Sequence, residues 1–294
     1  MSRIVRENIM DFHLDHIFDC GQAFRWEKQE DGSYTGAAGG RIANIQFDPD
    51  EENGTCGTLI INNASDEDFD NFWKEYLDLN RDYGEIKKVL GKDPVMANAI
   101  TYGEGIRLLQ HEPWETLLSF IISQNNHIPR IKKCIESLSE NFGEKIGVYN
   151  GREYYSLPSP EKLASLTEED LGICRLGYRA KYLIATAKKV CEEGIDSLNN
   201  AAGSHVSSKE AYEYITGFTG VGPKVANCIM LFALGKYDSF PLDVWMKRVM
   251  EEAYGLASPK EVADFAAQNF GEYGGFAQQY LFYYIRERKD TEIK

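Results

Sequence analysis

Short apolar runs rich in β-prone residues occupy the chain between residues 20 and 63, and this pattern predicts β-strands. The runs are Ser33-Tyr34-Thr35, 42–47 and 58–61, and the turn pairs beside them are Asp31-Gly32, Gly39-Gly40 and Asn53-Gly54. Turn pairs at this spacing indicate an antiparallel sheet. Ser65 then offers an N-cap for an amphipathic helix.

After about residue 100 the apolar spacing becomes helical throughout. We expect helices over 113–122, 128–142, 159–166, 168–174, 179–193, 208–216, 223–234, 243–254, 259–270 and 275–288. The predicted fold class is therefore α+β. It has a small N-terminal antiparallel β-sheet domain over residues 1–100 and a two-part α-helical body over residues 101–294.

The segment 218–224 has the pattern Gly-Val-Gly-x-Lys at Gly220, Val221, Gly222 and Lys224. Two glycines two apart allow a tight turn with bare N–H groups, which makes a nest for a phosphate. Pro223 suits the first position of a helix and puts Lys224 in its first turn. The positive end of the helix dipole favours the neutral amine there, which is a nucleophile. The alternative is an ordinary connection between helices with a solvated lysine.

About twenty residues after Lys224 comes Pro241-Leu242-Asp243-Val244. Asp243 stands where a new helix begins after a break marked by proline. It can cap that helix, or it can offer a carboxylate to a reacting centre.

The net charge of −14 disfavours nucleic acid as a partner, because phosphate neutralisation drives most non-specific affinity. The acidity is concentrated in residues 1–100, with a balance of −10, whereas residues 101–294 carry −4. The second region is nearly balanced and can still gather a basic face. Charge alone favours a function without DNA, so a DNA-directed function has to rest on the motifs.

The six cysteines are scattered without a Cys-x-x-Cys pair, which argues against structural zinc and a disulfide framework. No apolar run reaches about 18 residues, so no membrane contact is expected. The first residues lack the apolar core of a signal peptide. We therefore expect an intracellular protein, in the cytoplasm and nucleoid of a prokaryote or the nucleus of a eukaryote.

The hairpin, Lys224 and Asp243 together resemble the helix-hairpin-helix–Gly/Pro–Asp motif of the DNA glycosylase superfamily. There the hairpin grips DNA phosphates, and the aspartate serves cleavage of the bond between base and sugar. A lysine at this position is associated with members that also nick the strand. Endonuclease-III-like and adenine-mispair members carry four closely spaced cysteines for an iron–sulfur cluster. No cysteine follows Cys228 here, so no such cluster is expected.

Further segments resemble the 8-oxoguanine DNA glycosylase/AP lyase family, in that family's order. The first is 20–26, Cys-Gly-Gln-Ala-Phe-Arg-Trp. The resemblance implies that the carbonyl of Gly21 accepts a hydrogen bond from N7–H, which only the oxidised base carries. The alternative is a glycine turn beside a buried tryptophan.

The second and third segments are 123–130 and 176–182. The resemblance implies that Asn125 fills the gap left by the extruded base and that Tyr178 wedges between bases. It also implies that Arg130 and Arg179 contact the widowed cytosine. The alternatives are a helix cap at the asparagines, and a Tyr178 that packs beside a solvated Arg179. His127 and Pro129 depart from the family's usual residues, which leaves the detailed shape of the loop open.

The fourth segment is 274–282, near the end of the chain. By resemblance Gln278 reads the Watson–Crick edge of the base, Phe282 stacks on one ring face and Cys228 covers the other. Gln278 and Phe282 are four apart and so share a helix face. The alternative is an aromatic stripe that belongs to the core. Trp245 stands where vertebrate-type members have histidine, which leaves the pocket wall open.

The resemblance implies a bifunctional enzyme that excises 8-oxoguanine opposite cytosine from duplex DNA. It would then nick the abasic site by β-elimination through a Schiff base on Lys224, with Asp243 as the second catalytic residue. We expect a monomer without catalytic metal or organic cofactor, although a structural cation on the hairpin carbonyls is compatible. The alternatives are an alkylpurine glycosylase of the same fold and a non-catalytic hairpin module that binds DNA.

Overall fold

A computed structural model of the chain describes residues 2–288. Contacts divide it into two compact units that interleave along the sequence. The first unit comprises the residues up to 22, 45–110 and those from 235 onward, and the second comprises 23–44 and 111–234. These units are defined by contacts within the fold, whereas the predicted division near residue 100 separates a β-rich region of the sequence from a helical one. The predicted domain boundary therefore stays a prediction.

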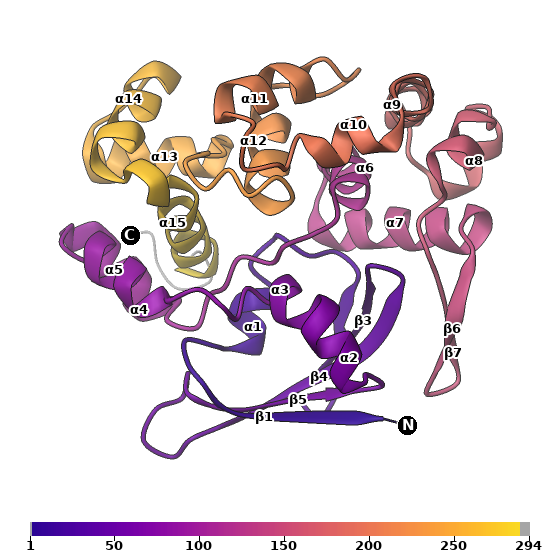
Figure 1. Cartoon of the computed structure of the whole chain (residues 1–294). Helices are drawn as coiled ribbons and strands as arrows, with labels where there is room; N and C mark the ends of the chain where they lie inside the picture. The colour runs from indigo at the N-terminus through magenta and orange to yellow at the C-terminus, as the bar shows by residue number, and fades with distance from the viewer. Residues whose placement is uncertain (1, 289–294) are drawn as a thin grey trace. The chain divides into compact units, whose positions relative to one another are not determined.

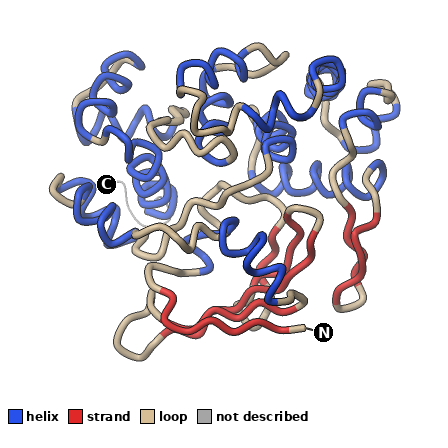
Figure 2. Tube along the Cα trace, viewed as in Figure 1, coloured by secondary structure: helices blue, strands red, loops and turns tan. Residues whose placement is uncertain are grey.

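A five-stranded antiparallel sheet forms the β-rich part of the chain, with the strand order β1-β5-β4-β3-β2. Strands are drawn in red in Figure 2. Its strands are β1 (Arg3–Ile9), β2 (Trp26–Lys28), β3 (Tyr34–Ala38), β4 (Arg41–Pro49) and β5 (Gly57–Asn62). The three predicted strands and the antiparallel sheet are confirmed. The sequence does not reveal β1, since four of its seven residues are exposed and its apolar residues do not alternate.

Helices make up most of the rest of the first unit, and Figure 1 labels them. They are α1 (Leu14–Phe18), α2 (Asp66–Asp68), α3 (Lys74–Tyr76), α4 (Tyr83–Leu90), α5 (Pro94–Tyr102), α13 (Val244–Tyr254), α14 (Pro259–Asn269) and α15 (Gly274–Arg288), with a π-helical turn at Phe69–Trp73 and a 3-10 turn at Gly271–Tyr273. The predicted cap at Ser65 is confirmed, because its side chain accepts a hydrogen bond from the Asp68 N–H. The last helix, α15, packs against α5 and α13.

The buried guanidinium of Arg107 ties three loops of the first unit together. It donates hydrogen bonds to the carbonyls of Met10 at 2.7 Å, Asp11 at 3.0 Å and Asp78 at 2.6 Å. Arg107 is only 4% exposed, so these carbonyls replace the water that its charge would otherwise require. The Oε1 of Gln22 accepts from the backbone N–H of Leu109, which fixes the start of the segment that contains Gly21.

The second unit holds the helices that follow the sheet. They are α6 (Pro113–Ser123), α7 (Ile128–Phe142), α8 (Pro160–Ala164), α9 (Arg179–Glu193), α10 (Ile195–Asn200), α11 (Ser208–Thr216) and α12 (Pro223–Phe232), with a 3-10 turn at Asp170–Cys174. The predicted helices of this region are confirmed, and α7, α9 and α11 have the predicted bounds, whereas the helix predicted over 168–174 is the short 3-10 turn. None of the helices that the structure describes is long and apolar enough to cross a bilayer.

The expectation of helices throughout the region after residue 100 is wrong at one place. A two-stranded hairpin, β6 (Lys145–Tyr149) and β7 (Arg152–Tyr155), follows α7. Asn150 and Gly151 form its turn with φ values of 48° and 79°, which is the Asn-Gly signature of a tight hairpin. Tyr149 and Tyr154 pack on Ala37 and Ile42 of the sheet, so the hairpin is stabilised by contacts distant in sequence.

We expect Gly143→Ala to destabilise the second unit. Gly143 ends α7, and a Cβ built there lies 1.8 Å from the carbonyl oxygen of Ser156. The backbone must shift to remove this clash, and the free energy of unfolding should fall by about 1–3 kcal/mol in urea denaturation. Gly172→Ala is the matched control, because nothing lies within 4 Å of a Cβ at Gly172. Equal losses in the two variants would contradict this explanation.

Candidate active site

The hairpin between α11 and α12 has the backbone that the glycine pattern predicts. Gly220 has a φ of 85°, in the left-handed region, and Gly222 caps α12 with Pro223 at the first helical position. Val221 is buried between the glycines, and its N–H donates to the carbonyl of Phe218 at 3.1 Å. The N–H groups of Gly220 and Gly222 have no hydrogen-bond partner among the described residues, which leaves them available for an anion.

Lys224 lies half-buried in the first turn of α12 against an aromatic wall. Its Nζ is 5.3 Å from the ring centroid of Phe120. Phe120 stacks on Phe232 at 5.6 Å and meets the edge of Phe24 at 5.7 Å. These rings keep water from one side of the amine. Phe120 is a residue that sequence reasoning missed, although its position in an apolar helix directly before the asparagine loop was a usable signal.

Cys228 follows Lys224 by one turn of α12 and is 4% exposed. The spacing of four puts both residues on one face of the helix, as the sequence predicts.

The asparagine loop after α6 is held by the guanidinium of Arg179. Arg179 is 3% exposed and donates to the carbonyls of Gln124 at 2.9 Å and Asn125 at 3.0 Å. A third hydrogen bond of 3.2 Å goes to the carbonyl of Leu176. Asn125 has a φ of 46°, a left-handed conformation that these hydrogen bonds help to fix. In the structure Arg179 therefore braces the loop, and its contact with a cytosine stays a prediction.

Tyr178 stands at the start of α9, after Gly177 with a φ of 59°. Its ring is 45% exposed, and its hydroxyl lies 3.4 Å from the carbonyl of Gln124. The Arg179 guanidinium packs 4.6 Å from the centroid of the same ring. Exposed Arg130, on α7, donates to the carbonyl of Arg175 at 3.3 Å. The second unit thus brings together the four residues predicted to fill the gap, wedge between bases and contact the opposite base, at the loop after α6 and the starts of α7 and α9.

The predicted base-reading residues of the first unit also meet. Gly21 has a φ of 85°, and a Cβ built on it lies 3.1 Å from the Cε1 of Phe282, so these two residues are neighbours. Gln278 lies one turn before Phe282 on α15 and is 5% exposed. Its buried Oε1 accepts no hydrogen bond among the described residues. An orphaned acceptor of this kind costs about 1–3 kcal/mol, and an N–H donor of a bound molecule can satisfy it.

Asp243 is the N-cap of α13, and its Oδ1 accepts a hydrogen bond from the Met246 N–H at 2.8 Å. The capping alternative is therefore realised, and it fixes the direction of the carboxylate at the start of the helix. Trp245, two residues later, is 39% exposed, and the guanidinium of Arg248 lies 5.0 Å from its ring.

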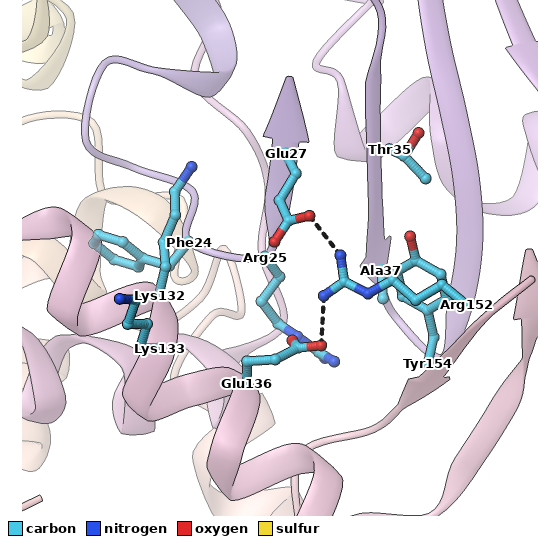
Figure 3. Close-up of a pocket in the computed structure, with 10 residues that line it drawn as sticks. All are labelled: Phe24, Arg25, Glu27, Thr35, Ala37, Lys132, Lys133, Glu136, Arg152 and Tyr154. Atoms are coloured by element: carbon cyan, nitrogen blue, oxygen red, sulfur yellow. Dashed lines mark hydrogen bonds and ion pairs between the residues drawn. The ribbon is translucent and has the colours of Figure 1, made fainter. Parts of the chain in front are cut away.

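A separate pocket of about 130 Å³ opens in the second unit, and Figure 3 shows its lining. Arg152 lies between two carboxylates and donates to Glu136 at 2.7 Å and to Glu27 (Figure 3). Arg25 lies 3.6 Å from Glu115, whose pKa is raised by burial. None of the predicted site residues lines the pocket, and these two arginines are paired with carboxylates. The ion pairs of Arg152 therefore link β7 to α7 and to β2.

Metal and cofactor expectations are not decided by this geometry. Among residues 2–288, no cluster of three or more His, Cys, Asp or Glu side chains could hold a metal ion. The expected absence of a catalytic metal, an iron–sulfur cluster and an organic cofactor stays a prediction, as does a cation on the hairpin carbonyls.

Comparison with known proteins gives two family matches that together cover most of the chain. Residues 4–117 match the family 8-oxoguanine DNA glycosylase, N-terminal domain, and residues 118–271 match the HhH-GPD superfamily base excision DNA repair protein. The N-glycosylase/DNA lyase of Saccharomyces cerevisiae is 32% identical over 267 residues, which are 86% of this chain and 71% of the relative.

Solved structures give similar results. MBOgg1 in complex with a low-affinity DNA ligand is 45% identical with a TM-score of 0.92, over 98% of this chain and 97% of that one. The Clostridium acetobutylicum 8-oxoguanine glycosylase/lyase has been solved with double-stranded DNA containing cytosine opposite 8-oxoguanine. It is 43% identical with a TM-score of 0.88, over 98% of this chain and 99% of that one.

We expect Arg179→Met to destabilise the protein even without DNA. The change removes the donor of the Asn125 carbonyl and leaves the Gln124 carbonyl with only the longer hydrogen bond from Tyr178, and the free energy of unfolding should fall by about 1–3 kcal/mol. Arg130→Met is the matched control, because Arg130 is exposed and its loss should change stability by less than about 0.5 kcal/mol. Urea denaturation measures both variants, and a neutral Arg179→Met would show that the brace contributes nothing.

Proposed function

Because this chain belongs to the 8-oxoguanine DNA glycosylase/lyase family of the HhH-GPD superfamily, we propose that it excises 8-oxoguanine from duplex DNA opposite cytosine and nicks the resulting abasic site. The observation that carries the proposal is Lys224, an amine in the first turn of α12 directly after a bare phosphate nest. A glycosylase that uses only water needs no such amine, whereas strand nicking through a Schiff base does.

Lys224 acts as the nucleophile. Its neutral amine attacks the anomeric carbon C1′, the C1′–N9 bond breaks, and the departing base takes the electron pair and a proton. The sugar ring opens to a Schiff base between C1′ and Lys224. Removal of a proton from C2′ then expels the 3′ phosphate by β-elimination, which nicks the strand. The Nζ of Lys224 lies 5.3 Å from the centroid of the Phe120 ring, which places the amine against an aromatic wall of the second unit.

Asp243 stabilises the positive charge that develops on the sugar as the base departs. Its hydrogen bond to the Met246 N–H supports this role, because the cap holds the carboxylate in one direction before the substrate binds. Electrostatic stabilisation is effective when the charged group needs no reorganisation during the reaction.

Four residues recognise the lesion base. The carbonyl of Gly21 accepts from N7–H, and Gln278 reads the Watson–Crick edge. Phe282 and Cys228 cover the two faces of the ring. The contact of Gly21 with Phe282 supports the first and third roles. The orphaned Oε1 of Gln278 supports the second, because the N–H groups on that edge of a purine are the donors it lacks.

Duplex DNA is gripped on both strands. The N–H groups of Gly220 and Gly222, with Val221 between them, hold a backbone phosphate. Tyr178 wedges between bases, while Asn125 occupies the gap left by the extruded base, since lifting a base out of the stack costs a few kcal/mol. Arg130 contacts the cytosine, and Arg179 joins it while fixing the loop. The protein acts as an intracellular monomer.

A substrate panel tests the proposal. Duplexes containing 8-oxoguanine opposite each of the four bases are compared with duplexes containing hypoxanthine and alkyladenine. We expect excision and nicking of 8-oxoguanine, fastest opposite cytosine. Preference for alkyladenine would identify an alkylpurine glycosylase, and binding without any excision would identify a non-catalytic DNA-binding module.

We expect Lys224→Gln to abolish the covalent complex that borohydride traps on 8-oxoguanine duplex. The amide cannot form a Schiff base, so no reducible link exists. Lys188→Gln, an exposed lysine on α9, is the matched control and should still be trapped. Trapping that survives Lys224→Gln would mean that another residue is the nucleophile.

We expect Asp243→Asn to lower single-turnover base excision by about 10²-fold or more, with little change in affinity for the lesion duplex. Asparagine is as good an N-cap as aspartate, so α13 should keep its start and the free energy of unfolding should change little. Asp243→Ala, which loses cap and charge together, is the comparison. Equal losses of excision and binding in Asp243→Asn would point to a structural role alone.

A further inference from the structure

Tyr182 lies between two parts of the proposed site without belonging to either. It follows Tyr178 by one turn on α9 (Arg179–Glu193) and is half-buried. Its hydroxyl has no hydrogen-bond partner among the described residues, so its contacts are those of the ring. All of the contacts below lie within the second unit.

One side of the Tyr182 ring packs on the hairpin. A Cβ built on Gly220 would lie 2.6 Å from the Cδ2 and 2.7 Å from the Cγ of this ring. The ring therefore lies against the bare Cα of the residue whose N–H is proposed to hold a phosphate. Two features require a glycine at Gly220: its φ is 85°, and a Cβ there would clash with the Tyr182 ring.

The ring of Tyr182 also contacts the ring of Tyr178, the proposed wedge. Its centroid is 5.7 Å from that of Tyr178 at an interplanar angle of 74°, an edge-to-face pair. Such pairs have a preferred geometry, so a shift of one ring changes the favoured position of the other. The Nζ of Lys181 lies 5.4 Å from the centroid of the Tyr182 ring.

We propose that Tyr182 is a positioning residue that couples the phosphate grip of the hairpin to insertion of the Tyr178 wedge. A phosphate held at Gly220 fixes the surface on which the Tyr182 ring rests, and the ring in turn holds Tyr178 in the direction of the base stack. The inference rests on the proposed function, because both the grip and the wedge are parts of it.

A double-mutant cycle tests the coupling. Base extrusion is followed by the fluorescence of 2-aminopurine placed next to 8-oxoguanine, and affinity is measured over a series of salt concentrations. The variants are Tyr178→Ala, Tyr182→Leu and the double variant. We expect Tyr178→Ala to reduce extrusion at least about threefold less in the Tyr182→Leu background than in the native one, because residues in contact are non-additive.

The salt series separates this role from simple packing. Loss of a phosphate contact made by a lysine or arginine lowers the slope of log affinity against log salt by about 1, and a helix N-terminus carries roughly half of such a charge. We expect Tyr182→Leu to lower the slope by about 0.5, although Tyr182 itself carries no charge. Tyr182→Phe keeps the ring and should match the native protein in both measurements.

Tyr154→Leu is the matched control, since Tyr154 is a buried tyrosine of the same unit that contacts neither Gly220 nor Tyr178. It should leave the salt slope unchanged and be additive with Tyr178→Ala. If Tyr182→Leu does not fold, as judged by circular dichroism, Tyr182→Met takes its place with the same expected outcomes.

The outcomes distinguish this inference from the proposed function. Absence of excision by the native protein would remove the proposed function itself. Native excision together with additive effects and an unchanged slope in Tyr182→Leu would overturn the coupling and leave the proposed function intact.

Discussion

Left-handed backbone is the constraint on which the DNA-directed surfaces of this protein depend. Gly21 and Gly220 both have a φ of 85°, Gly177 has 59° and Asn125 has 46°. Each stands at the turn of one predicted contact segment, where the chain must reverse and present backbone groups or one side chain outward. Glycine adopts this conformation without cost, and asparagine is the next most tolerant residue. At Gly21, Gly220 and Asn125 the left-handed residue is itself a predicted contact, whereas Gly177 lies directly before one.

Local charge resolves the conflict between an acidic chain and an anionic partner. Residues 116–135 and 171–191 contain no Asp or Glu, although the net charge of the chain is −14. The first window carries three Lys or Arg residues and the second carries five. Asn125 lies within the first window and Tyr178 within the second, and the hydrogen bond from Arg130 to Arg175 joins the two windows. A positive surface needs only a local absence of carboxylates, because charges beyond a Debye length of about 8 Å are screened.

The features that the sequence predicts correctly are those that depend on residues close to one another along the chain. The bounds of α7, the proline at the start of α12 and the cap at Ser65 follow from local patterns, and the structure confirms them. The β6–β7 hairpin was not predicted, although Asn150-Gly151 is the turn pair typical of a tight hairpin. Contacts between distant segments cannot be derived this way. The approach of Gly21 to Phe282 and the brace of Arg179 on Gln124 are examples, since tertiary packing decides them.

The unpaired amide oxygen of Gln278 has opposite effects on the stability of the protein and on its recognition of a base. A leucine of similar size would remove a buried acceptor that lacks a donor, and so would make the empty protein more stable. Under the proposed function, the same change would also remove the group that reads the base. Natural selection for thermal stability and for recognition therefore act in opposite directions at one position of α15. The penalty carried there by the empty protein is released when a purine edge arrives, so occupancy itself should raise the melting temperature.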